Sequence, residues 1–128
     1  MGYYKIDEKL LDKQFEVKIG SRHNVQMYYV INKILLQLQF NVASIGFYYW
    51  ITAIKQHRKN YYKYDNTIEK VYNDVAKIHN TTRARVERAM RTARTPATEQ
   101  IQKHFNYYNK LTNKTVLELL TRKTLFID

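Results

Sequence analysis

Apolar residues recur every three or four positions along most of this chain, which is the spacing of one face of an α-helix. Only one proline and three glycines interrupt the pattern. A chain of 128 residues is long enough for one compact core and too short for two. The pattern therefore predicts an all-α domain of about five to six helices.

Two helices are predicted in the first half of the chain. The run VQMYYVINKILLQLQF (residues 25–40) follows Asn24, a residue type that favours the N-cap. Its expected core stripe is Met27, Ile31, Ile34, Leu35 and Leu38. After a break at residues 41–44, the run IGFYYWITAIKQHRKN (residues 45–60) predicts a second helix with a basic C-terminal end. Its expected stripe is Tyr49, Trp50, Ala53, Ile54 and His57.

Residues 61–66, YYKYDN, are expected to connect to a third helix that begins at Asn66. Glu69 lies three positions further on, as in a capping box. The core stripe expected of this third helix is Ile68, Val71, Tyr72, Val75 and Ile78. A turn of about four residues then leads to Thr82, which is expected to cap a fourth helix. Two such helices joined by a short turn predict a helix-turn-helix over residues 66–95.

The fourth helix lies in NTTRARVERAMRTAR, residues 80–94. At about 100° per residue, its apolar and charged positions separate onto opposite sides. The apolar side consists of Val86, Ala89, Met90 and Ala93. Arginine suits a guanine edge or a phosphate, and Glu87 could accept a hydrogen bond from a cytosine amino group. The alternative is that Glu87 only pairs with Arg83 or Arg91 on a solvated face.

The formal net charge of +11 favours a polyanionic partner, either nucleic acid or anionic lipid. No apolar run is long enough to span a membrane, and the apolar helix faces are needed to bury one another, so no membrane partner is expected. Paired tyrosines could stack on unpaired bases, but core-edge positions are the simpler interpretation. The absence of cysteine and of a signal-peptide pattern fits a soluble cytoplasmic protein.

Nothing in the sequence predicts an enzyme, a metal site, a cofactor or a small-molecule substrate. The four histidines are scattered, and no metal-ligand or phosphate-loop spacing accompanies them. His57 and His79 are expected to end helices or line the core. Residues 1–30 are treated as an N-terminal extension of unknown role, in which QFEVKIG has a strand-like alternation. The domain proper is expected over residues 31–128.

The segment HNTTRARVERAMRTA resembles the signature of the C-terminal DNA-binding domain of stage 0 sporulation protein A, whose pattern is N-T-T-P-S-R-V-E-R-A-I-R-H-A. INKILLQLQF, GFYYWITAI and VYNDVAKIHNTT resemble further segments of that family, and the correspondence is ungapped from Ile31 to Ala93. HFNYYNKLTNKTVLELL is similar to the family's C-terminal stretch after two shortenings.

The resemblance implies a helical domain that binds double-stranded DNA in the major groove and reads a short TGTCGAA-like box, commonly as paired domains on adjacent copies. Carried over by position, it implies base reading by Arg85, Glu87 and Arg88. Contacts to the DNA backbone are expected from Thr82, Arg83, Arg91 and Arg94. A homodimer or tandem pairing on DNA is a further expectation.

Several positions depart from the family pattern. Arg83 replaces a proline and Ala84 replaces a serine, which adds charge and removes a hydroxyl. Pro96 is expected to end the recognition helix by about Thr95. About 30 residues ahead of Ile31 cannot form the family's phosphorylated receiver domain, so binding is expected to be constitutive and set by abundance.

Two roles stay open for a double-stranded DNA reader with this sequence. One is a transcription regulator that occupies family-type boxes. The other is an accessory DNA-binding protein of a plasmid or phage, serving replication, partition or transfer. A non-specific basic nucleic-acid binder is the remaining alternative, and it differs from both by lacking a preferred box.

Overall fold

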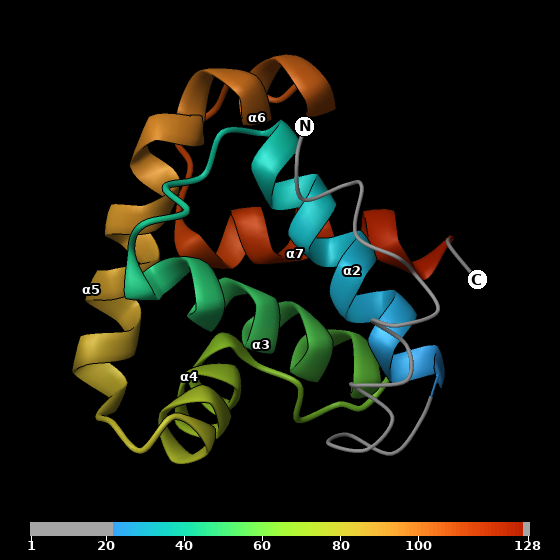
Figure 1. The fold of residues 1–128 in the computed structure, drawn as a ribbon, viewed down its shortest axis with the longest axis vertical. Helices are drawn as coiled ribbons and strands as arrows, with labels where there is room; N and C mark the ends of the chain where they lie inside the picture. The colour runs from blue at the N-terminus through green and yellow to red at the C-terminus, as the bar shows by residue number, and fades with distance from the viewer. Residues whose placement is uncertain (1–21, 127–128) are drawn as a thin grey trace.

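The computed structural model describes residues 22–126, and every regular element in that part of the chain is a helix (Figure 1). In chain order these are α2 (Arg22–Gln37), α3 (Ile45–Lys59), α4 (Ile68–Ile78), α5 (Arg83–Arg94), the 3-10 helix η2 (Thr95–Ala97), α6 (Thr98–Phe105) and α7 (Asn113–Leu125). The predicted all-α fold is confirmed. The strand-like alternation at residues 14–20 lies outside the described residues. Within the described helices, none is long and apolar enough to cross a membrane.

Helix α3 is the centre of the domain, and α2, α4, α5 and α7 all pack against it (Figure 1). Its sequence is apolar on nearly every side, as expected for a helix surrounded by others. Trp50 is completely buried and Phe47 is nearly so. The two predicted core stripes of the first half, on α2 and α3, are confirmed as buried.

Helix α2 begins earlier than predicted. It starts at Arg22, so Asn24 lies inside its first turn and is not the N-cap. The helix then runs without a break across residues 30 and 31 to Gln37. Gln39 follows with a φ of 71°, and this left-handed residue turns the chain toward α3. Ser44 caps α3 by accepting a hydrogen bond from the Gly46 N–H.

The start of α4 also differs from the prediction. Its N-cap is Thr67, whose hydroxyl accepts the Lys70 N–H, and not Asn66. Asn66 is engaged elsewhere, because its amide donates to the His57 carbonyl at 3.1 Å and its Oδ1 lies 3.0 Å from the His57 Nδ1. The prediction for Ile78 is wrong, since this side chain is 53% exposed. It lies at the end of α4, where the chain leaves the core to turn into α5.

The predicted helix-turn-helix is confirmed in α4 and α5. Residues 79–82 join the two helices, and Asn80 in this turn has a φ of 53°. The Thr81 N–H donates to the Ala76 carbonyl at 2.9 Å, which satisfies one of the open carbonyls at the end of α4. Thr82 caps α5, as predicted.

Pro96 ends the fourth helix where the sequence predicts. Helix α5 stops at Arg94, and Pro96 lies in the first turn of η2, which leads into α6. Asn106, with a φ of 50°, ends α6 in the left-handed conformation typical of helix C-termini. The chain then returns as α7, which packs against both α3 and α5.

Candidate nucleic-acid interface

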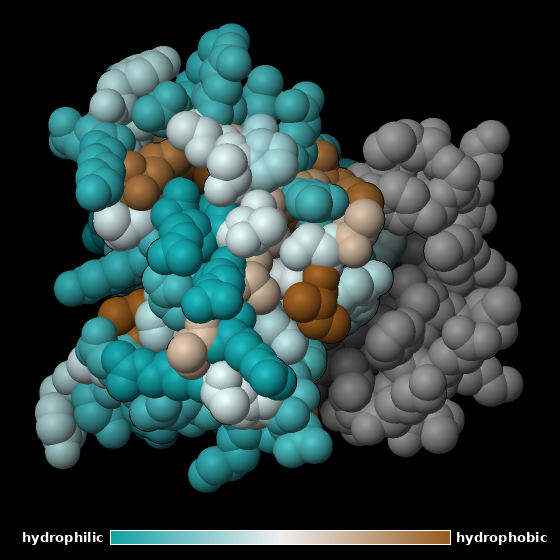
Figure 2. All heavy atoms as spheres, turned by 90° about the vertical axis from the view of Figure 1, so that its left-hand side faces the viewer, coloured by the Kyte–Doolittle hydropathy of each residue, from teal (hydrophilic) through white to brown (hydrophobic). Residues whose placement is uncertain are grey.

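The charged side of α5 faces outward. Figure 2 views the molecule from the side on which α5 lies, and hydrophilic side chains cover most of that face. The exposed members of the predicted site are Thr82, Arg83, Arg85, Arg88 and Arg91. Glu87 and Arg94 are only partly exposed. One helix thus presents four exposed guanidinium groups to solvent, with a single acid between them.

The opposite side of α5 is inserted into the core. Val86, Met90 and Ala93 are completely buried, and Ala89 is partly buried beside them. The approach to α3 is close, since a Cβ placed on Gly46 would overlap the Ala89 carbonyl and lie 2.9 Å from the Ala93 Cβ. Only glycine allows two helix backbones to come this near at that point.

Three carbonyls on the buried side of α5 accept hydrogen bonds from other elements. The Trp50 indole N–H of α3 donates to the Met90 carbonyl at 2.8 Å. The backbone N–H of Asn41, in the α2–α3 connection, donates to the Ala93 carbonyl at 2.9 Å. The Asn113 side-chain amide of α7 donates to the Glu87 carbonyl at 3.1 Å. The α5 backbone is therefore hydrogen-bonded to three other elements of the domain.

The Arg94 side chain is hydrogen-bonded to α7. Its Nε–H donates to the Asn113 Oδ1 at 2.7 Å, and the side chain is partly buried. Burial lowers the pKa of Arg94 from its ordinary value, while the nearby Tyr72 and Glu87 act in the opposite direction. A guanidinium remains charged under such a shift. Arg94 therefore links two helices and is not fully displayed with the other arginines.

Glu87 pairs with Arg91 one turn away. The Arg91 Nη1 donates to the Glu87 Oε1 at 2.9 Å, and the Arg91 and Glu87 side chains are 53% and 38% exposed. An exposed helical pair of this kind contributes only about 0.3–0.5 kcal/mol. The bond agrees with the predicted alternative for Glu87, but it is weak enough for either side chain to exchange partners at little cost.

The N-terminus of α5 lies on the same exposed face. The Thr82 hydroxyl accepts the Arg85 N–H at 3.3 Å. The first N–H groups of a helix have no acceptor within the helix, and they favour anions. Arg83 and Arg85 add positive charge in this first turn. The first turn of α5 thus combines helix N-terminal backbone donors with two exposed arginines.

His79 holds the turn between α4 and α5 against α3. Its Nε2 lies 2.7 Å from the Thr52 hydroxyl, and its ring centroid is 4.9 Å from that of Tyr49. Burial lowers the pKa of His79 below its ordinary 6.5. As predicted, this histidine ends a helix, since it is the C-cap of α4.

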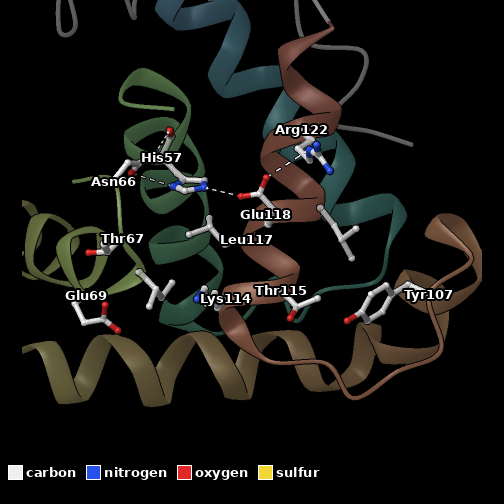
Figure 3. A pocket seen from close by; sticks show the side chains of 12 residues that line it. His57, Asn66, Thr67, Glu69, Tyr107, Lys114, Thr115, Leu117, Glu118 and Arg122 are labelled. Atoms are coloured by element: carbon white, nitrogen blue, oxygen red, sulfur yellow. Dashed lines mark hydrogen bonds and ion pairs between the residues drawn. The ribbon is translucent and has the colours of Figure 1, made fainter. Parts of the chain in front are cut away.

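A pocket of about 660 Å³ lies apart from the charged side of α5, between the start of α4 and α7 (Figure 3). His57 and Glu118 meet at its edge, with 3.2 Å between the His57 Nε2 and the Glu118 Oε1. Burial raises the pKa of Glu118, but hydrogen bonds from Tyr61 and His57 outweigh it, so the pKa is lower than usual. His57 is buried, as predicted for a core histidine.

The residues that fix α5 in place are not among the predicted site residues. Trp50 is predicted to be buried, and a buried indole N–H requires an acceptor, but the sequence does not identify that acceptor. A glycine inside a helical pattern signals a close approach, so Gly46 could have been found. Nothing local distinguishes Asn113 from the polar residues around it.

Comparison with protein families matches residues 31–124 to the family described as the sporulation initiation factor Spo0A C terminal. No curated protein and no solved structure matches significantly. Within residues 22–126, no cluster of three or more histidine or acidic side chains is placed to hold a metal ion. The family is one of DNA-binding domains of transcription factors, not of enzymes. The match covers well over half of the chain, and the chain therefore belongs to the family of Spo0A C-terminal DNA-binding domains.

Proposed function

We propose that this protein is a sequence-specific reader of double-stranded DNA and a transcription regulator that recognises short TGTCGAA-like boxes. In this proposal α5 enters the major groove, and Arg85, Glu87 and Arg88 contact base edges. The observation that carries it is the two-sided construction of α5. One side is buried and hydrogen-bonded by three other elements, and the other displays exposed arginines around one acid.

The backbone contacts are proposed from Thr82, Arg83, Arg91 and Arg94. Thr82 and Arg83 lie at the N-terminus of α5, where backbone N–H groups favour phosphate. Arg91 is exposed one turn beyond Glu87. Arg94 is held through its Nε–H by Asn113, so it would reach a phosphate with its terminal amino groups. The reading unit is residues 66–95 within a domain over residues 31–128, and pairing of two domains on adjacent boxes is part of the proposal.

Glu87 is the residue that separates base reading from general attraction to DNA. A surface that binds only phosphates gains nothing from an acid at its centre. The pair with Arg91 is worth about 0.5 kcal/mol at most, so it does not prevent Glu87 from accepting a cytosine amino group. Breaking the pair would also free the Arg91 guanidinium to contact a phosphate. On binding DNA, Glu87 would thus exchange Arg91 for a base, and Arg91 would exchange Glu87 for a phosphate.

The test starts with selection of preferred sequences from random duplexes. Affinities for the selected duplex and for a scrambled one are then measured by fluorescence anisotropy over a series of salt concentrations. We expect the selected duplex to be preferred by at least tens-fold at physiological salt. Equal affinities with a steep salt dependence would reject sequence reading and leave a non-specific basic binder.

Two substitutions assign the roles within α5. Glu87→Ala is expected to flatten the base preference more than it weakens total binding, whereas Arg91→Ala is expected to weaken all duplexes alike. Glu99→Ala on α6 is a matched control, because Glu99 also forms an exposed helical pair, with Lys103 at 3.0 Å. An unchanged preference in Glu87→Ala would mean that Glu87 serves only the helical pair.

A further inference from the structure

Carbonyl groups inside an α-helix already accept a bond from the next turn, yet two on α5 accept a second one from another element. A third carbonyl, in the last turn of α5 before Pro96, also accepts a bond from outside the helix. The acceptors are the carbonyls of Glu87, Met90 and Ala93, spaced three residues apart and so along one side of the helix. The donors come from α7, from α3 and from the connection before α3. Two of them are side chains, Asn113 and Trp50, and both are buried.

We propose that Trp50 and Asn113 are positioning residues for base reading, because they fix the rotation of α5 about its own axis. The inference rests on the proposed function, in which α5 reads the groove. Neither residue belongs to the exposed face of α5, and each would act through the α5 backbone. The last helix of the domain, which carries Asn113, thereby becomes part of the reading unit.

Apolar packing alone would leave a wider range of rotations of α5 about its own axis. Val86, Met90 and Ala93 are buried, but apolar contact has no preferred direction, whereas a hydrogen bond weakens steeply when its angle changes. The side-chain surface of a helix lies about 5–6 Å from the axis, so a rotation of about 20° moves it by about 2 Å. A shift of that size is enough to break a hydrogen bond to a base edge.

Both donors are themselves held. Trp50 is completely buried, so losing its acceptor would leave an unsatisfied N–H in the core. The orientation of the Asn113 amide is fixed because its Oδ1 accepts the Arg94 Nε–H at 2.7 Å. That contact directs the amide nitrogen to the Glu87 carbonyl at 3.1 Å. Asn113 therefore makes two hydrogen bonds to α5, one to the Glu87 carbonyl and one from the Arg94 side chain two turns further on.

The experiment removes each of the two hydrogen-bond donors separately, with a substitution that keeps most of the side chain. Trp50→Phe removes the indole N–H and keeps an aromatic ring. Asn113→Asp keeps an acceptor for Arg94 and removes the donor to the Glu87 carbonyl. The controls are Phe47→Leu, a core reduction in the same helix, and Asn109→Asp, the same charge change at an exposed site before α7. Circular dichroism identifies a temperature at which all the variants are folded.

The readout is the ratio of affinities for the selected and scrambled duplexes. We expect this ratio to fall about fivefold or more in Trp50→Phe and in Asn113→Asp, with affinity for the scrambled duplex unchanged within about twofold. The controls should lose stability or gain charge without changing the ratio. A residue with a merely structural role would lower the melting temperature and leave the ratio intact.

The outcomes distinguish the two proposals. If the unmodified protein does not discriminate between duplexes, the proposed function is wrong. If it discriminates and both variants keep the full ratio, the positioning role is wrong and the function stands. Should one variant fail to fold, the other decides, because the two bonds come from different helices.

Discussion

Replacing Gly46 by alanine would insert one methyl group between α3 and α5. The added Cβ would overlap the Ala89 carbonyl and lie 2.9 Å from the Ala93 Cβ, whereas carbon atoms pack best at about 3.5–4.0 Å. The obstructing group is backbone, so no side-chain rotation can relieve it. The two helices must separate by about 1 Å or distort. Overpacking of this kind costs about 1–3 kcal/mol.

Alanine also favours a helix over glycine by at most about 1 kcal/mol, and less in the first turn, where Gly46 lies. The expected net loss is therefore about 1–2 kcal/mol in the free energy of unfolding. Urea unfolding can follow it through the fluorescence of Trp50, the only tryptophan in the chain. Because α5 is displaced, discrimination between duplexes should fall in the same variant.

The neighbouring Ile45→Ala is the control, because Ile45 is 58% exposed and its loss should change stability by no more than about 0.5 kcal/mol. Adding Ala93→Gly to Gly46→Ala removes the Cβ contact but not the overlap with the Ala89 carbonyl, so no recovery is expected. A Gly46→Ala protein as stable as the parent would refute the close approach of the two helices.

Three further predictions concern the α5 cap and two groups with lowered pKa values. Thr82→Ala removes the α5 cap and should lower the free energy of unfolding by about 1 kcal/mol; an unchanged urea midpoint would mean that the cap contributes nothing. The lowered pKa of His79 contributes stability above pH 6.5 that is lost as the pH falls through the folded pKa. His79→Tyr should therefore reduce the slope of the free energy of unfolding against pH in that range. Equal slopes in the variant and the parent would contradict this prediction. The lowered pKa of Glu118 contributes stability that is lost as the pH falls below 4.5, and Glu118→Gln should remove that part of acid unfolding, as urea titrations at several pH values can check.

Helix faces could be predicted from the sequence because a stripe of apolar residues depends only on local spacing. The burial of Ile31, Leu35, Val86 and Met90 follows from that spacing. The end of α5 before Pro96 follows equally well, since a proline has no N–H to donate and its ring clashes with the carbonyl four residues earlier.

Features that depend on a distant partner could not be predicted in the same way. Asn66 and Thr67 are both good capping residues, and the choice falls on Thr67 while Asn66 bonds to His57, nine residues earlier. Asn113 contacts the Glu87 carbonyl 26 positions away, and no local pattern announces that contact. The exposed arginines of α5 can be recognised in the sequence, but the hydrogen bonds that hold α5 in place cannot.

The contact between Asn113 and α5 has a consequence for the order of synthesis. Helices α4 and α5 leave the ribosome before α7, which follows Arg94 in the chain. A nascent chain that has released only the helix-turn-helix therefore lacks one of the three bonds to α5, and Arg94 still lacks its buried partner. Domains fold largely as units during translation. Under the proposed positioning role of Asn113, such an incomplete chain lacks a bond that fixes the rotation of α5, so the proposed selective reading of DNA would require α7 to have docked.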